Sequence, residues 1–194
     1  MVTEKPSLHD PRVLRALAHP VRNRILTELS ATGPLRAADI ARDLGIPANQ
    51  ASFHLRQLAK YGLVEEDPDA ARDRRDRVWK LVADTGYTIE LGEVEKAPGG
   101  KAASAVFRRT RAAWAHVVVD EAYGDDRSKD TMRSVMEQSI KLTKDEAKQL
   151  CTDLQEVADR WSLKTRGRDD ARRTYLLFQI VQPFPERSME SVDG

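Results

Sequence analysis

The stretch of sequence that decides the fold is residues 48–64, which reads ANQASFHLRQLAKYGLV. Ala51, Leu55 and Leu58 recur at the spacing of one helix face, so the pattern predicts an amphipathic helix with one buried side. Gly62 is expected to end this helix, because glycine readily adopts the left-handed conformation that follows a helix C-terminus.

The residues around this helix predict an ordered series of helices followed by strands. Asp10 and Pro11 are typical of an N-cap with proline at the first helical position. His19-Pro20 interrupts the apolar helical pattern, and Gly45 is placed to end a helix. Helices are therefore expected over residues 11–19, 20–32, 37–44 and 47–61, and strands over 63–66 and 77–82. Four helices followed by a hairpin with a charged turn are the order of elements in a winged helix-turn-helix.

Composition bounds the class of protein. The chain has 194 residues, 40% of them hydrophobic and 32% charged, which fits one or two globular domains that each bury a core. No apolar run approaches the roughly 18 residues of a membrane span, and no signal-peptide pattern opens the chain. The one cysteine, Cys151, permits no internal disulfide, so we expect a cytoplasmic protein without a membrane partner.

The charge is distributed almost evenly along the chain. Residues 1–82 hold 14 Lys and Arg against 11 Asp and Glu, and residues 83–194 hold 18 against 20. This asymmetry is too mild to indicate a nucleic-acid partner by itself. Evidence for a nucleic-acid partner must therefore come from the positions of individual charged residues.

The residues beyond the hairpin predict a second region of mixed structure. Thr143-Lys144-Asp145-Glu146 is a capping box that opens an apolar-striped helix. The other elements expected here are a helix over 102–123 and strands over 136–142 and 175–181, with 88–91 a candidate short strand. The fold class is thus mainly α with small β: a winged helix-turn-helix domain over 1–83, a linker over 84–101, a small α+β domain over 102–187 and a disordered tail over 188–194. Dimerisation, an effector pocket or a partner-binding face are the roles left open for the α+β domain.

Three segments taken together resemble the ArsR family of bacterial regulators. They are Leu17-Ala18-His19-Pro20-Val21-Arg22, Ala51-Ser52-Phe53-His54-Leu55-Arg56-Gln57-Leu58 with Tyr61-Gly62-Leu63-Val64 behind it, and Arg77-Val78-Trp79-Lys80-Leu81. The resemblance covers about residues 11–82. It implies a winged helix-turn-helix that binds double-stranded DNA, with residues 47–61 as its recognition helix and Arg22 among the residues at the DNA.

The recognition helix leaves short polar side chains exposed once its apolar face is buried. A major groove about 12 Å wide admits one helix, and Asn or Gln can pair with adenine while Arg pairs with guanine. The exposed residues expected to contact DNA are Ala48, Asn49, Gln50, Ser52, Phe53 and Arg56. The alternative interpretation is an ordinary solvated helix face.

His54 and Pro47 differ from the other candidate residues of this helix. The resemblance implies a structural or phosphate-contacting role for His54, and a metal-binding role is disfavoured because Leu58 stands where a second ligand would be needed. Pro47 departs from the Ser or Thr that is usual in the family and supplies no hydroxyl to a phosphate.

The turn between the two predicted strands carries arginines that are candidates for phosphate or minor-groove contacts, namely Arg72, Arg74, Arg75 and Arg77. The same turn holds four aspartates, Asp67, Asp69, Asp73 and Asp76. Self-paired charges on a solvated loop are therefore a competing interpretation.

Many members of the resembled family sense metals through paired cysteines or a His/Asp cluster, and this chain has neither pattern. No metal and no cofactor is therefore expected. Cys151 falls on the apolar stripe of its helix and is expected to be a buried small side chain.

The function expected is that of a sequence-specific transcriptional regulator, taken as a repressor, that binds an inverted-repeat operator as a homodimer. An unidentified small-molecule or protein effector is left open. The alternative is a winged-helix module that binds another protein of the transcription machinery. The sequence contains no nucleophile–base arrangement, glycine-rich phosphate loop or metal spacing, so an enzyme is not expected.

Overall fold

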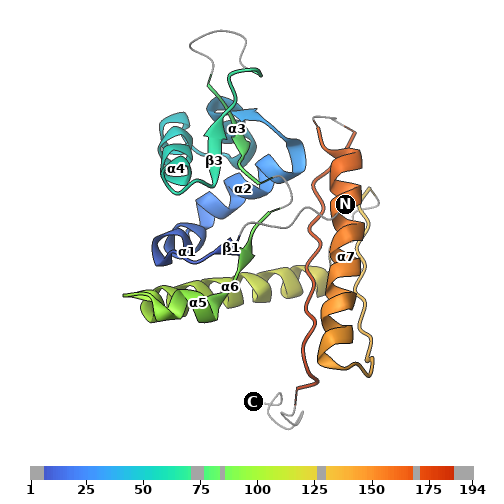
Figure 1. The fold of residues 1–194 in the computed structure, drawn as a ribbon. Coiled ribbons are helices and arrows are strands. Elements are labelled where there is room, and N and C mark those ends of the chain that lie inside the picture. Colours follow the sequence, from blue (N-terminus) through green and yellow to red (C-terminus); the bar gives the residue numbers. More distant parts are fainter. Residues whose placement is uncertain (1–6, 71–76, 84–85, 126–129, 168–170, 186–194) are drawn as a thin grey trace.

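The computed structural model describes residues 7–70, 77–83, 86–125, 130–167 and 171–185. It is mostly helical with a small antiparallel sheet, which confirms the predicted fold class. Figure 1 shows helices α1 to α4 gathered around that sheet, α6 crossing beneath them and α7 standing to one side.

Prolines and glycines fix the ends of the first helices, α1 (Pro11–Leu17), α2 (Pro20–Thr32), α3 (Ala37–Leu44) and α4 (Ala48–Lys60). The Asp10 carboxylate accepts a hydrogen bond from the Arg12 backbone N–H at 2.8 Å, which confirms the predicted N-cap. Gly45 follows α3 in the left-handed conformation, at φ 65°, and redirects the chain into α4. These helices therefore lie within about two residues of their predicted bounds.

Three short strands form the sheet, β2 (Leu35–Arg36), β3 (Val64–Glu66) and β4 (Val78–Leu81), in the order β2-β4-β3. β3 and β4 are the two predicted strands, and they pair antiparallel with Val64 opposite Leu81. β2 was not predicted, because two residues are too few to show an alternating pattern. Its pairing with β4 ties the sheet to the start of α3.

One hydrophobic core joins the helices to the sheet. Its fully buried members come from α2, α3, α4 and the approach to β3: Ile25, Leu29, Ile40, Ala51, Leu55, Leu58 and Leu63. Burying one large aliphatic side chain contributes about 1.5–3 kcal/mol, so this cluster dominates the stability of the region. Ala51, Leu55 and Leu58 are the apolar face that the sequence predicted.

The range 84–101, expected to be a linker, contains regular structure in its described part. β5 (Thr88–Ile89) pairs in parallel with β1 (Ser7–Leu8), and α5 (Leu91–Lys96) follows it. A second small core of Leu14, Val94 and Ala103 then holds α1, α5 and the first turns of α6 (Gly100–Tyr123) together. The linker prediction was therefore wrong here: the segment docks on α1 instead of spanning open space.

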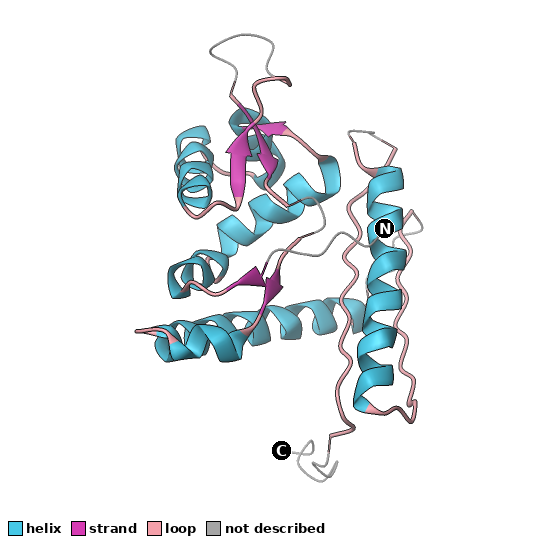
Figure 2. Cartoon of the chain, in the orientation of Figure 1, coloured by secondary structure: helices cyan, strands magenta, loops and turns pink. Residues whose placement is uncertain are grey.

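The last helix, α7 (Lys144–Thr165), begins at the predicted capping box. The Thr143 hydroxyl accepts from the Glu146 backbone N–H at 3.2 Å, and Glu146 Oε2 accepts from the Thr143 backbone N–H at 2.7 Å. The strands predicted over 136–142 and 175–181 are absent from the single chain. Figure 2 shows these residues as loops that run along α7, so the strand prediction was wrong for one isolated copy. The predicted tail, 188–194, lies outside the described residues.

Within the described residues, no helix is both long enough and apolar enough to cross a membrane.

Gly100 allows the tight approach between α5 and α6. A Cβ added at Gly100 would collide with the backbone carbonyl of Val94, whereas one added at Gly92 would meet nothing within 4 Å. We therefore predict that Gly100→Ala lowers the free energy of unfolding by about 1–3 kcal/mol, because rigid backbone has to move.

Gly92→Ala, in α5, is the matched control, and it should be neutral or stabilise by about 0.5–1 kcal/mol. Urea unfolding followed by circular dichroism compares the two variants. Equal midpoints for both would show that the α5–α6 contact is looser than described.

Candidate nucleic-acid interface

Helix α4 divides sharply into a buried and an exposed face. Ala51, Leu55 and Leu58 are fully buried against α2, α3 and the sheet. The opposite face lies in solvent, with four of the predicted residues, Ala48, Asn49, Gln50 and Arg56, all exposed. Ser52 is half-buried at the margin. The structure therefore places these side chains where the sequence predicted them.

Phe53 stands out on the exposed face because its ring is apolar. It is 48% exposed, on a helix face that is otherwise polar. Its ring packs edge-on to the His54 ring, with 5.4 Å between centroids, so it is partly held in place. A ring in this position can contact a thymine methyl group.

Arg56 carries the exposed positive charge at the centre of this face. It makes no ion pair with any residue in the described part of the chain. The arginines of the neighbouring helix differ: Arg42 is bound by Asp39 at 3.1 Å and by Asp43 at 3.2 Å. The Arg56 guanidinium is therefore available to an anion, whereas that of Arg42 is already paired.

The N-terminus of α4 is exposed to solvent. Pro47 is the N-cap and makes no side-chain capping bond, as its chemistry requires. The Asn49 side chain instead accepts from the Gln50 backbone N–H at 2.9 Å. Helix N-termini bind phosphate through free N–H groups and the helix dipole, so this end can contact phosphate without the missing hydroxyl.

His54 lies inside the domain, only 5% exposed, and cannot reach a phosphate from there. Its ring packs at a tilt against that of His19, with 4.7 Å between centroids and 47° between the ring planes. We therefore correct the candidate set: His54 supports α4 from behind. The sequence could not show this contact, because His19 precedes α2 and is far from His54 along the chain.

Arg22 is half-buried beside this histidine pair, and its Nε finds no hydrogen-bond partner in the described structure. Burial lowers the pKa of both histidines below the ordinary 6.5, and the positive charge of Arg22 lowers each pKa further. His19 and His54 are thus held neutral at physiological pH. Arg22 is only half-buried, so its guanidinium can still contact a phosphate.

The turn between β3 and β4 is the second part of the candidate interface. Arg77, at the start of the returning strand, pairs with Glu66 at 3.2 Å. Lys80 lies between Glu65 at 3.6 Å and Asp67 at 3.7 Å. Self-pairing thus holds for these two cations, whereas Arg72, Arg74 and Arg75 lie outside the described residues.

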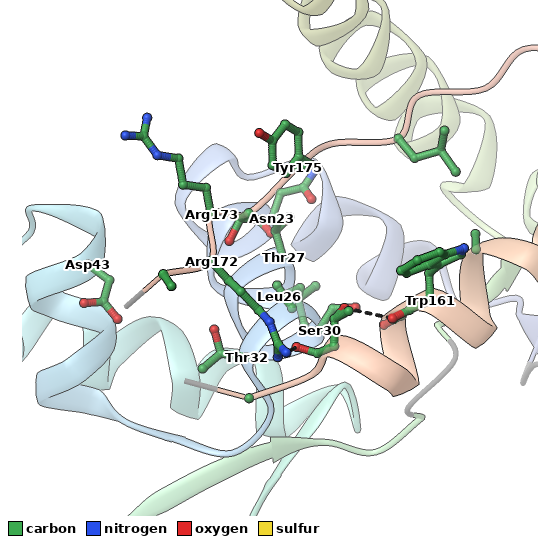
Figure 3. Close-up of a pocket in the computed structure, with 18 of the residues that line it drawn as sticks. Asn23, Leu26, Thr27, Ser30, Thr32, Asp43, Trp161, Arg172, Arg173 and Tyr175 are labelled. Carbon is green, nitrogen blue, oxygen red and sulfur yellow. Dashed lines mark hydrogen bonds between the residues drawn. The ribbon is translucent and has the colours of Figure 1, made fainter. Parts of the chain in front are cut away.

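A broad cleft separates α2 from α7 on another side of the molecule. It has a volume of about 1380 Å³ and is lined by Leu26 and Thr27 of α2, by Trp161 of α7 and by Arg172 and Tyr175 beyond it. Figure 3 shows the two aromatic rings and Arg172 around this space, with Asp43 of α3 at its edge. None of the residues that line the cleft belongs to α4.

Within the described ranges, no three His, Cys, Asp or Glu side chains gather in a way that could hold a metal ion. Cys151, expected to be buried, is exposed. The apolar stripe of α7 on which it lies is not covered within one chain.

Four helices, a short sheet and an outward-facing second helix of the pair α3–α4 define a winged helix-turn-helix domain. Residues 17–67 match a family model described as Helix-turn-helix domain. The chain is also 35% identical over 60 residues to the HTH-type transcriptional regulator YgaV of Escherichia coli. That match spans 31% of this chain and 61% of YgaV, so the chain covers less than two thirds of YgaV.

Two solved structures show weaker likeness. The transcriptional regulator Tm0710 of Thermotoga maritima is 14% identical, covers 80% of this chain and 85% of its own, and has a TM-score of 0.30. MarR of Escherichia coli is 16% identical, covers 77% and 87%, and has a TM-score of 0.34. TM-scores this low carry no weight for the arrangement of the domains or for function. The helix-turn-helix itself is shown, whereas the finer ArsR resemblance remains a prediction.

The neutral histidine pair makes stability depend on pH. Because the pKa values of His19 and His54 are lowered in the folded chain, the unfolded chain binds more protons once the pH falls below about 6.5. Stability should therefore be full above pH 6.5 and decline as the pH falls toward the lowered values. Urea midpoints measured from pH 7.5 to 5.5 should show this decline, and His54→Gln should flatten it. An equally steep decline in His54→Gln would rule out His54 as a source of this pH dependence.

Proposed function

We propose that this chain is a sequence-specific DNA-binding transcriptional regulator. The observation that carries the proposal is the two-faced α4, whose inner side is fully buried and whose outer side presents Asn49, Gln50, Phe53 and Arg56. Such a helix fits the major groove and offers hydrogen-bonding side chains to base edges. The match of residues 17–67 to a helix-turn-helix family and the 60-residue match to YgaV support the same function.

The finer features of the proposal are that the regulator is of the ArsR-like type, cytoplasmic, and a repressor that binds an inverted repeat as a homodimer. One winged domain presents one recognition helix, and a single helix contacts too few base pairs for high specificity. Two copies related by a twofold axis would place two α4 helices in successive major grooves. The repressor role rests on the family resemblance of the three segments within residues 11–82.

The competing function is a winged module that binds another protein. Protein interfaces favour an apolar centre depleted of charge. The exposed face of α4 has one ring, Phe53, among amide and guanidinium groups, which suits base edges better. The DNA-binding experiment below separates the two functions, since a protein-binding module has no reason to prefer one duplex.

Base reading is tested by Gln50→Ala. We predict a loss of about 1–3 kcal/mol in affinity for the selected operator and little change on random DNA, because only a base contact is removed. Fluorescence anisotropy on both duplexes measures this. Gln57→Ala is the matched control: it is the same residue type on the same helix, half-buried and two turns further from the N-terminus, and it should cost much less.

If Gln50→Ala loses no affinity on the operator, α4 is not the reading helix. Arg56→Ala adds information in the same assay. It should resemble Gln50→Ala where Arg56 pairs with guanine, and should weaken both duplexes equally where it binds phosphate.

Phosphate binding by the turn is tested by Arg75→Ala. Removing one phosphate contact should weaken binding to operator and random DNA alike, and should flatten the plot of log affinity against log salt by about one unit. Arg77→Ala is the control, because Arg77 already pairs with Glu66 and should change the slope less. An unchanged slope in Arg75→Ala would mean that the neighbouring aspartates neutralise this arginine.

A further inference from the structure

After Ser104, none of the residues that the structure describes has a buried side chain. All but two of the large apolar side chains that the structure exposes lie between Val106 and Phe184, and Met136 is 82% exposed. A soluble monomer rarely shows apolar surface on this scale. This C-terminal region, residues 105–185, therefore lacks a core of its own in a single copy.

Two segments of this region also leave their backbones unpaired. Residues 134–142, before α7, and 173–182, after it, belong to no helix or strand, and within the described structure their backbone N–H groups donate to no protein acceptor. Backbone groups of this kind are normally paired in a folded protein, and an unpaired extended segment is a template for another strand.

The sequence of the first segment is that of a strand with two distinct faces. Met136, Gln138, Ile140 and Leu142 alternate with Glu137, Ser139 and Lys141, so one face is mostly apolar, and residues 134–142 contain neither proline nor glycine. The second segment is rich in large apolar residues and ends at Pro183 and Pro185. Proline within a sheet is confined to edges and ends, so Pro183 and Pro185 end the second segment, whereas the first segment contains no residue that excludes it from a central position.

The two segments do not pair with each other within one chain. Figure 1 shows them running in the same direction on either side of α7. Where they come near each other, the Met132 backbone N–H donates to the hydroxyl of Tyr175 at 3.3 Å, so a side chain separates the backbones. Adjacent strands lie about 4.7–4.9 Å apart, closer than a tyrosine side chain between them allows.

We propose that a second copy of this chain supplies the missing strand. Residues 134–142 of each copy insert antiparallel between segments 134–142 and 173–182 of the other. The result is one four-stranded antiparallel sheet with the two 134–142 segments at its centre and α7 of each copy packed on it. This inference rests on the homodimer in the proposed function and specifies how the two copies join.

The charges of the central segment agree with this pairing. In a twofold antiparallel pair centred on Ser139, Glu137 lies opposite the partner's Lys141, and Lys141 lies opposite the partner's Glu137. On the other face, Met136 lies opposite the partner's Leu142. On that same face Ile140 lies opposite the partner's Gln138, so the match consists of the two Glu–Lys pairs and the two Met–Leu pairs. An unrelated protein would have to reproduce this match independently.

The direct test is a symmetric disulfide at residue 139, made in the full chain with Cys151 replaced by serine. In the proposed register the two 139 positions face each other, within the 4.4–6.8 Å between Cα atoms that a disulfide spans. Ser139→Cys should therefore give a covalent dimer under mild oxidation without DNA. Lys141→Cys is the control: its two copies would stand about 13 Å apart and should not cross-link alone. A mixture of Glu137→Cys and Lys141→Cys chains should cross-link.

Failure of Ser139→Cys to cross-link in a chain that sedimentation shows to be dimeric would overturn the proposed register and leave the homodimer standing. A monomer at micromolar concentration would overturn the inference and the homodimer together. DNA binding of the unmodified chain, measured separately, decides the regulator function in either case.

A charge exchange tests the same pairing without cysteine. Glu137→Lys puts like charges opposite each other twice in the dimer and should raise its dissociation constant about tenfold. Glu137→Lys combined with Lys141→Glu restores opposite charges and should return the constant to its original value, as measured by sedimentation equilibrium. No recovery in the double variant would contradict the register centred on Ser139.

Discussion

The burial of one face of α4 is the constraint on which the rest of the winged domain depends. Ala51, Leu55 and Leu58 are removed completely from water, and this fixes the rotation of the helix about its axis. The outward direction of Gln50 and Arg56 follows from that rotation. Behind the helix, His54 packs on His19 and fills the space between α4 and the start of α2. The exposed face is therefore held rigidly, and a helix that reads bases must be held in this way.

The sequence predicted this domain well because its boundaries are marked by local chemistry. Asp10, Pro11 and Pro20 start helices and Gly45 ends one, and each acts within a few residues of itself. Long-range contacts were not predictable in the same way. β2 and β1 are two residues long, and the burial of His54 depends on a contact across 35 positions in the chain. The wrongly predicted linker has the same cause: Val94 is buried only because Leu14 and Ala103 come together around it.

The C-terminal region was predicted less well, and the physical reason is different. The alternation in residues 134–142 is a genuine strand signal, and the stripe containing Cys151 is a genuine apolar face, but one chain supplies neither a neighbouring strand nor a cover. A sequence pattern can indicate that a surface is buried, but it does not indicate whether the same chain or a second chain covers that surface. The proposed second copy would account for both discrepancies at once. It would also bring two winged domains together, each with its own α4.

Selection of bound fragments from genomic DNA by the purified full chain tests the central claim most directly, because it requires both the reading helix and the pair of copies. The account predicts one enriched inverted repeat with half-site centres about 34–36 Å apart, the spacing of successive major grooves on one side of the duplex. Fragments enriched for no common sequence, or for a single unrepeated half-site, would contradict it.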